Sequence, residues 1–109
     1  NHPDKKRHML VWLTERNDDR ALEAAVPFLK DFDEAVRLAA VEVVFKQQSS
    51  EGRVPLEAVL IDPKEDSNRM RVRVAEIFAR RDWQVAEAEA VAEALPAEFV
   101  LRQGRVVRA

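Results

Sequence analysis

The chain contains no cysteine, and this absence excludes disulfide bonds, thiolate metal sites and cysteine nucleophiles. Tyrosine is also absent, and the only two glycines, Gly52 and Gly104, stand too far apart to form a glycine-rich phosphate loop. No apolar run approaches the roughly 20 residues that span a bilayer, and no signal peptide is visible. We therefore expect a cytoplasmic chain with no membrane segment.

Groups that could support catalysis or bind a metal are sparse. His2 and His8 are six residues apart, whereas two metal-binding histidines on one helix face stand three or four apart. Glu89 and Glu93 could meet on one face of a helix, but a solvated surface pair is the plainer interpretation. We therefore predict a chain that is not an enzyme and that needs no cofactor or metal.

The composition favours helix, because 109 residues with few glycines carry many alanines, glutamates, arginines and leucines. The strongest pattern is a partial repeat: motifs of the segment 22–45 return in the segment 56–78. In each copy an apolar stretch precedes an aspartate, and an arginine follows near the start of the next apolar segment. These positions are Leu29, Asp31 and Arg37 in the first copy, and Leu60, Asp62 and Arg71 in the second.

A weaker third copy precedes both of these. Arg7, Arg37 and Arg71 occupy matching places at steps of 30 and 34 residues. Self-similarity at such a period is typical of helical-repeat arrays. Because the first copy lacks its first half, we expect the chain to be a fragment of a longer array whose first helix pair is truncated.

The pattern predicts helices that are punctuated by proline and by capping residues. Pro27 should kink the second helix because it lacks an amide donor, and Asp33 should cap the third. The predicted helices cover residues 4–16, 19–30, 34–48, 55–61, 68–81 and 83–95. The expected core, taken from the recurring apolar positions, comprises Leu10, Leu13, Phe28, Val36, Ala40, Val44, Leu60, Val74, Ile77 and Phe78.

The last residues follow a different pattern from the rest. Two short apolar stretches, 99–102 and 105–108, flank Gln103 and Gly104, as in a β-hairpin with a two-residue turn. A disordered tail is the alternative. We therefore divide the chain into a helical repeat domain at 1–97 and a hairpin or tail at 98–109, where a hairpin would cap the last repeat.

The corner from Leu29 to Arg37, together with the preceding Pro27, resembles the corner of HEAT repeats, and the resemblance extends over residues 4–95. It implies an all-α fold, a right-handed α-solenoid of about three antiparallel helix pairs. In that family an aspartate and an arginine at each corner form a ladder between stacked repeats. Carried over, the ladder residues are Asp31, Arg37, Asp62 and Arg71, with Arg7 as the arginine of the truncated repeat. Their expected role is structural and not catalytic.

One polar window remains on the helices when they are projected at 100° per residue. If the curvature of the family applies, this window is the concave surface, and its charged side chains sum to +4 on a chain of net charge −2. Trp12 is either an interface anchor or a residue covered by an upstream helix. The window also contains Met9, Ala35, Ala39, Glu42 and Glu76. Its predicted binding residues are Lys5, Trp12, Arg16, Lys46, Arg69, Arg73 and Arg80.

These features predict a non-enzymatic protein–protein interaction scaffold whose basic face binds an acidic segment of a partner protein. One alternative is a nucleic-acid-binding module, since HEAT-like alkylpurine DNA glycosylases hold DNA along a basic concave face. The overall negative charge and the lack of tyrosine oppose it. Another alternative is a partner or subunit of an enzyme, as in the HEAT-like bilin lyases.

Overall fold

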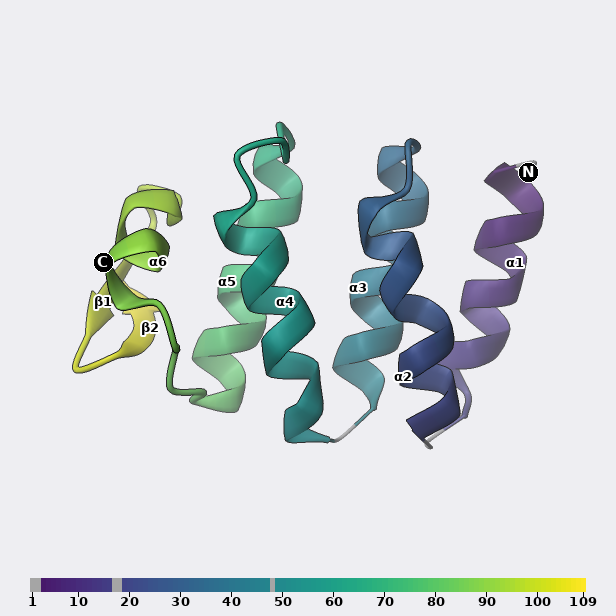
Figure 1. Cartoon of the computed structure of the whole chain (residues 1–109), viewed down its shortest axis with the longest axis horizontal. Coiled ribbons are helices and arrows are strands. Elements are labelled where there is room, and N and C mark those ends of the chain that lie inside the picture. The colour runs from purple at the N-terminus through teal and green to yellow at the C-terminus, as the bar shows by residue number, and fades with distance from the viewer. Residues whose placement is uncertain (1–2, 17–18, 48) are drawn as a thin grey trace. The chain divides into compact units, whose positions relative to one another are not determined.

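The computed structural model describes residues 3–16, 19–47 and 49–109, and over these ranges the chain is mostly helical (Figure 1). They contain six α-helices, two short 3-10 helices and one two-stranded antiparallel sheet. The chain divides into two compact units, Asn1–Gly52 and Arg53–Ala109. The hairpin at the end of the chain belongs to the second unit.

The first unit is built around one helix. It contains α1 (Pro3–Thr14), α2 (Asp19–Ala25), the 3-10 helix η1 (Val26–Lys30), α3 (Glu34–Lys46) and the 3-10 turn η2 (Ser50–Gly52). Both α1 and α2 pack against α3, and so does η1. The apolar face of α3 is therefore covered by the preceding helices of the same unit.

Proline and a capping aspartate set the boundaries of these helices. Pro27 stands at the start of η1, and the α-helical hydrogen bonding ends at Ala25. The predicted kink is thus a change from α-helix to the tighter 3-10 helix, as expected where an amide donor is missing. Asp33 accepts a hydrogen bond from the Val36 amide over 3.1 Å, so the predicted cap of α3 is confirmed.

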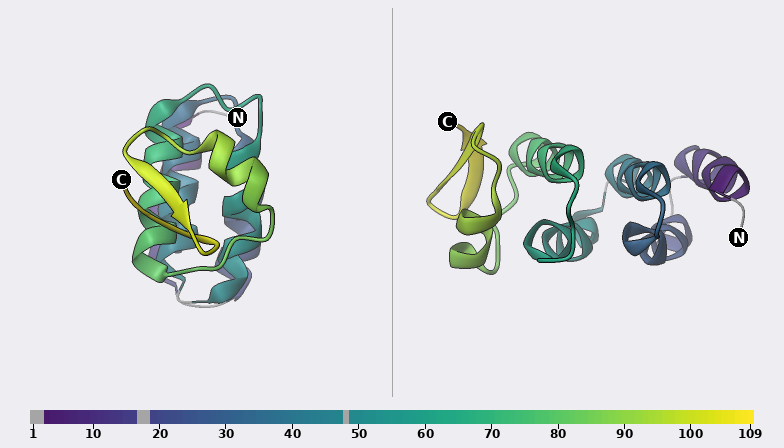
Figure 2. Two further views of the ribbon diagram at one scale, coloured as in Figure 1. Left: turned by 90° about the vertical axis from the view of Figure 1, so that its left-hand side faces the viewer. Right: turned by 90° about the horizontal axis from the view of Figure 1, so that it is seen from above.

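The second unit combines a helix pair with a short helix and the hairpin. It contains α4 (Arg53–Ile61), α5 (Asn68–Arg81), α6 (Ala88–Ala94), β1 (Phe99–Arg102) and β2 (Arg105–Arg108). The helix α5 packs along α4, and its predicted bounds are confirmed. Seen from above, α6 lies beside α4 and the hairpin lies beside α5 (Figure 2), in agreement with the packing of α6 on α4 and of β2 on α5.

The sixth helix is shorter than predicted. It begins at Ala88, whereas the prediction placed its start at residue 83. The preceding helix ends at Arg81, its C-cap Asp82 has a left-handed φ of 54°, and Gln84 then forms an isolated antiparallel bridge with Arg105. The Val85 amide donates to the Gly104 carbonyl over 2.8 Å, so these residues bond to the hairpin turn instead of forming a helical turn. The prediction for residues 83–87 is therefore wrong.

The predicted hairpin is confirmed with its register. Strands β1 and β2 pair antiparallel around Gln103 and Gly104, whose φ angles of 52° and 79° are both positive, as type I′ turns require. A Cβ atom at Gly104 would lie 1.8 Å from Nε2 of Gln84. That amide donates to the Gln103 carbonyl over 3.3 Å, so glycine leaves room for a side chain that ties the turn to the extended segment.

The predicted core is confirmed at nine of its ten positions, each at most 5% exposed. Phe28 is the exception, because its side chain is only half-buried. It lies in η1, where 3-10 geometry turns each residue further than an α-helix does, and the inward position belongs to Leu29, which is 3% exposed. The buried set is Leu10, Leu13, Val36, Ala40, Val44, Leu60, Val74, Ile77 and Phe78.

Candidate functional site

The first corner, between η1 and α3, is built on Asp31. One carboxylate oxygen receives a 2.8 Å hydrogen bond from Nζ of Lys6, and the other accepts the Asp33 amide over 3.0 Å. The Arg37 guanidinium donates to the Asp31 carbonyl over 3.0 Å and to the Phe32 carbonyl over 3.1 Å. Asp31 and Arg37 are therefore neighbours, as predicted, and the arginine holds the backbone of the corner.

The second corner, between α4 and α5, has the same two kinds of bond. Oδ1 of Asp62 accepts the Lys64 amide over 2.9 Å, and the Arg71 guanidinium donates to the Asp62 carbonyl over 3.3 Å. The longer loop adds a further link, because Glu65 accepts the Ser67 amide over 3.1 Å. Ser67 in turn caps α5. Three extra residues are thus accommodated without losing the contact between arginine and carbonyl.

The Asp31 carboxylate has a further basic partner, Lys6, which the sequence pattern did not single out. Arg7 donates to Asp4 over 3.2 Å on the exposed side of α1, whereas Lys6 reaches the corner. Lys6 stands four and seven residues before Leu10 and Leu13, so it shares their buried face. This helical spacing could have predicted that Lys6 lies on the side of α1 that faces the rest of the unit. Contacts between the two corners, as in the proposed ladder, stay a prediction.

A stability measurement can test the Lys6 bond. This hydrogen bond is the main reason that the pKa of Asp31 lies below its usual value near 3.8. The Asp33 amide and the charge of Arg37 lower it further, although burial opposes them. We expect Lys6→Met to lower the free energy of unfolding at pH 7 by about 1–2 kcal/mol.

The lowered pKa of Asp31 determines how the effect of Lys6→Met should change with pH. Such a carboxylate stabilises the fold above its unfolded pKa, and this contribution is lost as the pH falls through the folded pKa. The difference between wild type and Lys6→Met should therefore shrink below pH 3.8 in thermal unfolding. Lys5→Met, at an exposed neighbouring position, is the control and should have little effect. A difference that stays constant from pH 7 into strong acid would contradict the assignment.

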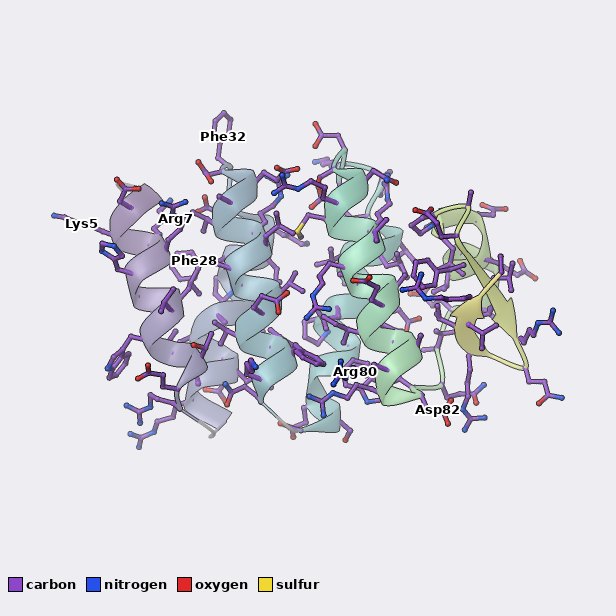
Figure 3. The ribbon with its side chains drawn as sticks, turned by 180° about the vertical axis from the view of Figure 1, so that it is seen from behind. Lys5, Arg7, Phe28, Phe32, Arg80 and Asp82 are labelled. Carbon is purple, nitrogen blue, oxygen red and sulfur yellow. The ribbon has the colours of Figure 1, made fainter. Side chains whose placement is uncertain are left out.

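Three predicted binding residues lie on α1 or directly after it. Lys5 and Trp12 are on α1, and Arg16 follows its last residue, Thr14. All three are exposed, and Trp12 is 57% exposed. The guanidinium of Arg16 lies 5.1 Å from the centroid of the Trp12 ring, within cation–π range. Lys5 points away from α3 (Figure 3). Lys46 is exposed in the last turn of α3, in the same unit.

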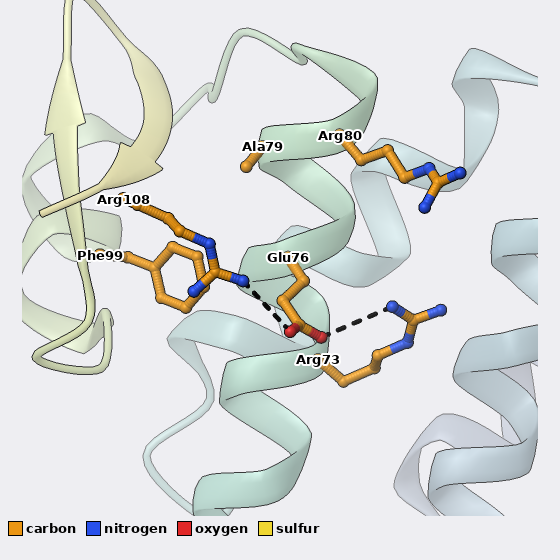
Figure 4. A pocket seen from close by; sticks show the side chains of 6 residues that line it. All are labelled: Arg73, Glu76, Ala79, Arg80, Phe99 and Arg108. Carbon is orange, nitrogen blue, oxygen red and sulfur yellow. Dashed lines mark hydrogen bonds and ion pairs between the residues drawn. The ribbon is translucent and has the colours of Figure 1, made fainter.

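The other predicted binding residues lie on α5 in the second unit. Arg69 and Arg80 are exposed, and Arg73 is half-buried. Two of these arginines border a pocket of about 380 Å³ between α5 and the hairpin (Figure 4). We name it the basic pocket, and it is lined by Arg73, Glu76, Ala79, Arg80, Phe99 and Arg108.

A glutamate between two arginines organises the basic pocket. Glu76 faces Arg73 through one oxygen and Arg108 through the other, each at 3.5 Å. The Arg108 guanidinium lies 5.0 Å from the ring centroid of Phe99, which is 3% exposed. Three guanidinium groups and one carboxylate give the lining a net charge of +2. The pocket therefore combines a fixed positive charge with an aromatic wall.

Arg73 and Arg80 were predicted on a common binding surface, whereas Phe99 and Arg108 were not predicted to bind. Both of these residues lie in the hairpin, which was expected only to cap the last repeat. The alternation in β1 and β2 was the available signal, because Phe99 and Arg108 form the first cross-strand pair of the hairpin. The local spacing did not indicate which helix Phe99 and Arg108 would face.

Within residues 3–16, 19–47 and 49–109, no cluster of three or more histidine, aspartate or glutamate side chains is arranged to hold a metal ion. None of the helices in these ranges is long and apolar enough to cross a membrane. Comparisons of the chain with protein families, curated proteins and solved structures gave no match. Its function must therefore be argued from its own residues.

Proposed function

We propose that this chain is a non-enzymatic, HEAT-like protein-binding scaffold whose basic pocket receives acidic side chains of a partner segment. The observation that carries the proposal is the gathering of Arg73, Arg80 and Arg108 around one pocket with a single carboxylate, Glu76. The excess of positive charge favours a carboxylate ligand and steers its approach. A cytoplasmic location belongs to the same proposal.

The chemistry of the lining fits a carboxylate-bearing segment. A guanidinium can donate two parallel hydrogen bonds to one carboxylate, which a lysine cannot do. Glu76 holds Arg73 and Arg108 in place, so less side-chain entropy is lost on binding. The buried ring of Phe99 lies under the Arg108 guanidinium and helps to hold it in place.

The HEAT-like part of the proposal is supported by the two corners. At each of them an aspartate accepts the amide two residues on, and an arginine of the next helix donates to the carbonyl of that aspartate. The recurrence of the same hydrogen bonds at matching sequence positions supports a repeated structural unit, as in helical-repeat proteins. In such arrays the corners serve the fold, which leaves the helix faces for binding.

A peptide titration tests the pocket. A short fluorescein-labelled peptide of glutamate and leucine is titrated with the full chain and followed by fluorescence anisotropy. We expect binding that the double variant Arg73→Gln, Arg80→Gln weakens at least about tenfold, which equals 1.4 kcal/mol. Binding should also weaken with salt, because the Debye length falls from about 10 Å at 0.1 M to about 3 Å at 1 M.

The control is a double variant with the same loss of charge outside the pocket. Lys64 and Arg102 are exposed in the same unit and do not line the pocket. The variant Lys64→Gln, Arg102→Gln should bind the peptide within about twofold of wild type, since distant exposed charges are screened at physiological salt. Equal weakening in both double variants would show that only the net charge matters, and it would refute the basic pocket as the binding site.

A further inference from the structure

The second unit contains a strongly acidic segment as well as the basic pocket. Residues 82–101 contain five acidic side chains and neither lysine nor arginine. The helix α6 lies in the middle of this segment, and its Glu89 and Glu93 are exposed. We name this the acidic segment; its charged residues are Asp82, Glu87, Glu89, Glu93 and Glu98.

We propose that the acidic partner of the basic pocket is a second copy of this chain, which inserts the glutamates of α6. This inference rests on the proposed function, because it names the partner of the same pocket. Asp82, at the start of the acidic segment, pairs with Arg105 at 3.2 Å. On α6 the acidic segment presents the two negative charges of Glu89 and Glu93, and the pocket lining has a net charge of +2. Complementary charge of this kind favours one partner and suppresses like-charged ones.

The two surfaces occupy different sides of the second unit. The pocket lies between α5 and the hairpin, whereas α6 packs against α4 and β1 (Figure 2). A contact that joins two different surfaces is heterologous, so each copy would offer one surface of each kind. Association can therefore continue beyond a dimer unless the rotation between copies closes a ring.

The spacing of the charges is compatible with such a contact. Glu89 and Glu93 are four residues apart, so they share one face of α6 with about 6 Å of helical rise between them. Arg73 and Arg80 are seven residues apart, which gives about 10.5 Å along α5. Long, flexible side chains can close this difference. Exposed alanines next to the glutamates leave space for the helix to approach.

Two variants that each lose one surface test the inference. The pocket variant is Arg73→Gln, Arg80→Gln, and the acidic-segment variant is Glu89→Gln, Glu93→Gln. Sedimentation velocity of the full-length wild type at 0.05 M salt should show an average mass that rises with concentration and falls again at 0.5 M salt. Each variant alone should remain a monomer. The control variant Lys64→Gln, Arg102→Gln should associate like wild type.

Mixing the two variants gives the decisive result. The pocket variant keeps its acidic segment, and the acidic-segment variant keeps its pocket, so together they can make one contact. We expect a one-to-one dimer that grows no further. The inference is overturned if wild type stays monomeric at low salt, if either variant associates like wild type, or if the mixture does not dimerise.

The proposed function can survive that failure. If wild type is monomeric but binds the glutamate–leucine peptide through Arg73 and Arg80, the pocket binds acidic segments and its partner is another protein. If neither association nor peptide binding occurs, both proposals fail. If both occur, the peptide should compete with self-association, because both ligands would occupy the same pocket.

Discussion

Replacing Glu57 by alanine should lower the free energy of unfolding by about 3 kcal/mol, because a buried carboxylate that accepts three part-buried hydrogen bonds is lost. Glu57 stands on α4, and its side chain is 4% exposed. Its carboxylate accepts the Ala86 amide at 3.0 Å and the Glu87 amide at 2.7 Å, and Arg53 pairs with it over 2.5 Å. One buried carboxylate thus secures the chain just before α6.

The position of these bonds explains why the effect should be large. Glu87 is the N-cap residue of α6 and makes no side-chain cap of its own. The carboxylate from α4 accepts the amide of this N-cap residue and that of the residue before it, and it places a negative charge where the helix dipole favours it. Loss of Glu57 should therefore loosen α6 as well as lower global stability.

Chemical denaturation and amide hydrogen exchange measure the two effects separately. Glu57→Gln keeps one acceptor oxygen and should lower the free energy of unfolding by about 1–2 kcal/mol, less than Glu57→Ala does. Glu89→Ala, at an exposed glutamate, is the control and should change stability by less than about 0.5 kcal/mol. The amides of Ala86 and Glu87 should exchange faster in Glu57→Ala. If these amides exchange at the wild-type rate, the carboxylate does not hold the segment.

The hydrogen bonds of Glu57 show why the start of α6 could not be predicted from the sequence. Residues 86–94 are alanine and glutamate apart from Val91, and they favour helix by intrinsic propensity. A helix beginning at residue 83 was therefore expected, but the amides of Val85, Ala86 and Glu87 donate to Gly104 and Glu57 instead. These acceptors are distant along the chain. Local propensity was overridden by tertiary hydrogen bonds.

Features set by neighbouring residues were predictable. The hairpin turn at Gln103 and Gly104 and the cap at Asp33 depend on residues close in sequence. The cap was predicted, and the hairpin was one of the two interpretations of the last residues. The repeat assigned Arg37 and Arg71 to their corners, and the structure shows that each donates to the backbone carbonyl of the corner aspartate. The recurrence of the aspartate and arginine positions in two copies indicated a shared structural role, which one copy alone would not have indicated.

The candidate site was predictable only in part, for a related reason. Helical spacing placed Arg73 and Arg80 on one face of α5. The wall opposite them comes from Phe99 and Arg108, which reach α5 because β2 packs against it. That packing brings together residues about 30 positions apart. No helical or strand period specifies such a contact.

Introducing an acid at Ala40 should be the most damaging single change in the first unit. Ala40 lies in the middle of α3 and is completely buried, with Val36, Val43 and Val44 on the same helix also buried. A carboxylate there would lose its hydration and meet apolar side chains. We expect Ala40→Asp to lower the free energy of unfolding by about 3–5 kcal/mol, the cost of an uncompensated buried charge.

The adjacent alanine provides a matched control. Ala39 is in the same helix but only half-buried, so Ala39→Asp introduces the same side chain with the same helix propensity where water can reach it. It should cost about 1 kcal/mol or less. Urea denaturation monitored by circular dichroism gives both values. Equal losses in the two variants would mean that helix propensity, and not burial, decides the outcome.

The pH dependence of Ala40→Asp gives a second check. Burial in apolar surroundings raises the pKa of a carboxyl group, because it disfavours the charged form. A raised folded pKa makes the penalty grow as the pH rises above the unfolded value and shrink in acid. The stability difference between Ala40→Asp and wild type should therefore be smaller at pH 4 than at pH 7. A difference that grows in acid would show that the new carboxyl group is stabilised in its charged form, contrary to the burial of Ala40 in the core of the first unit.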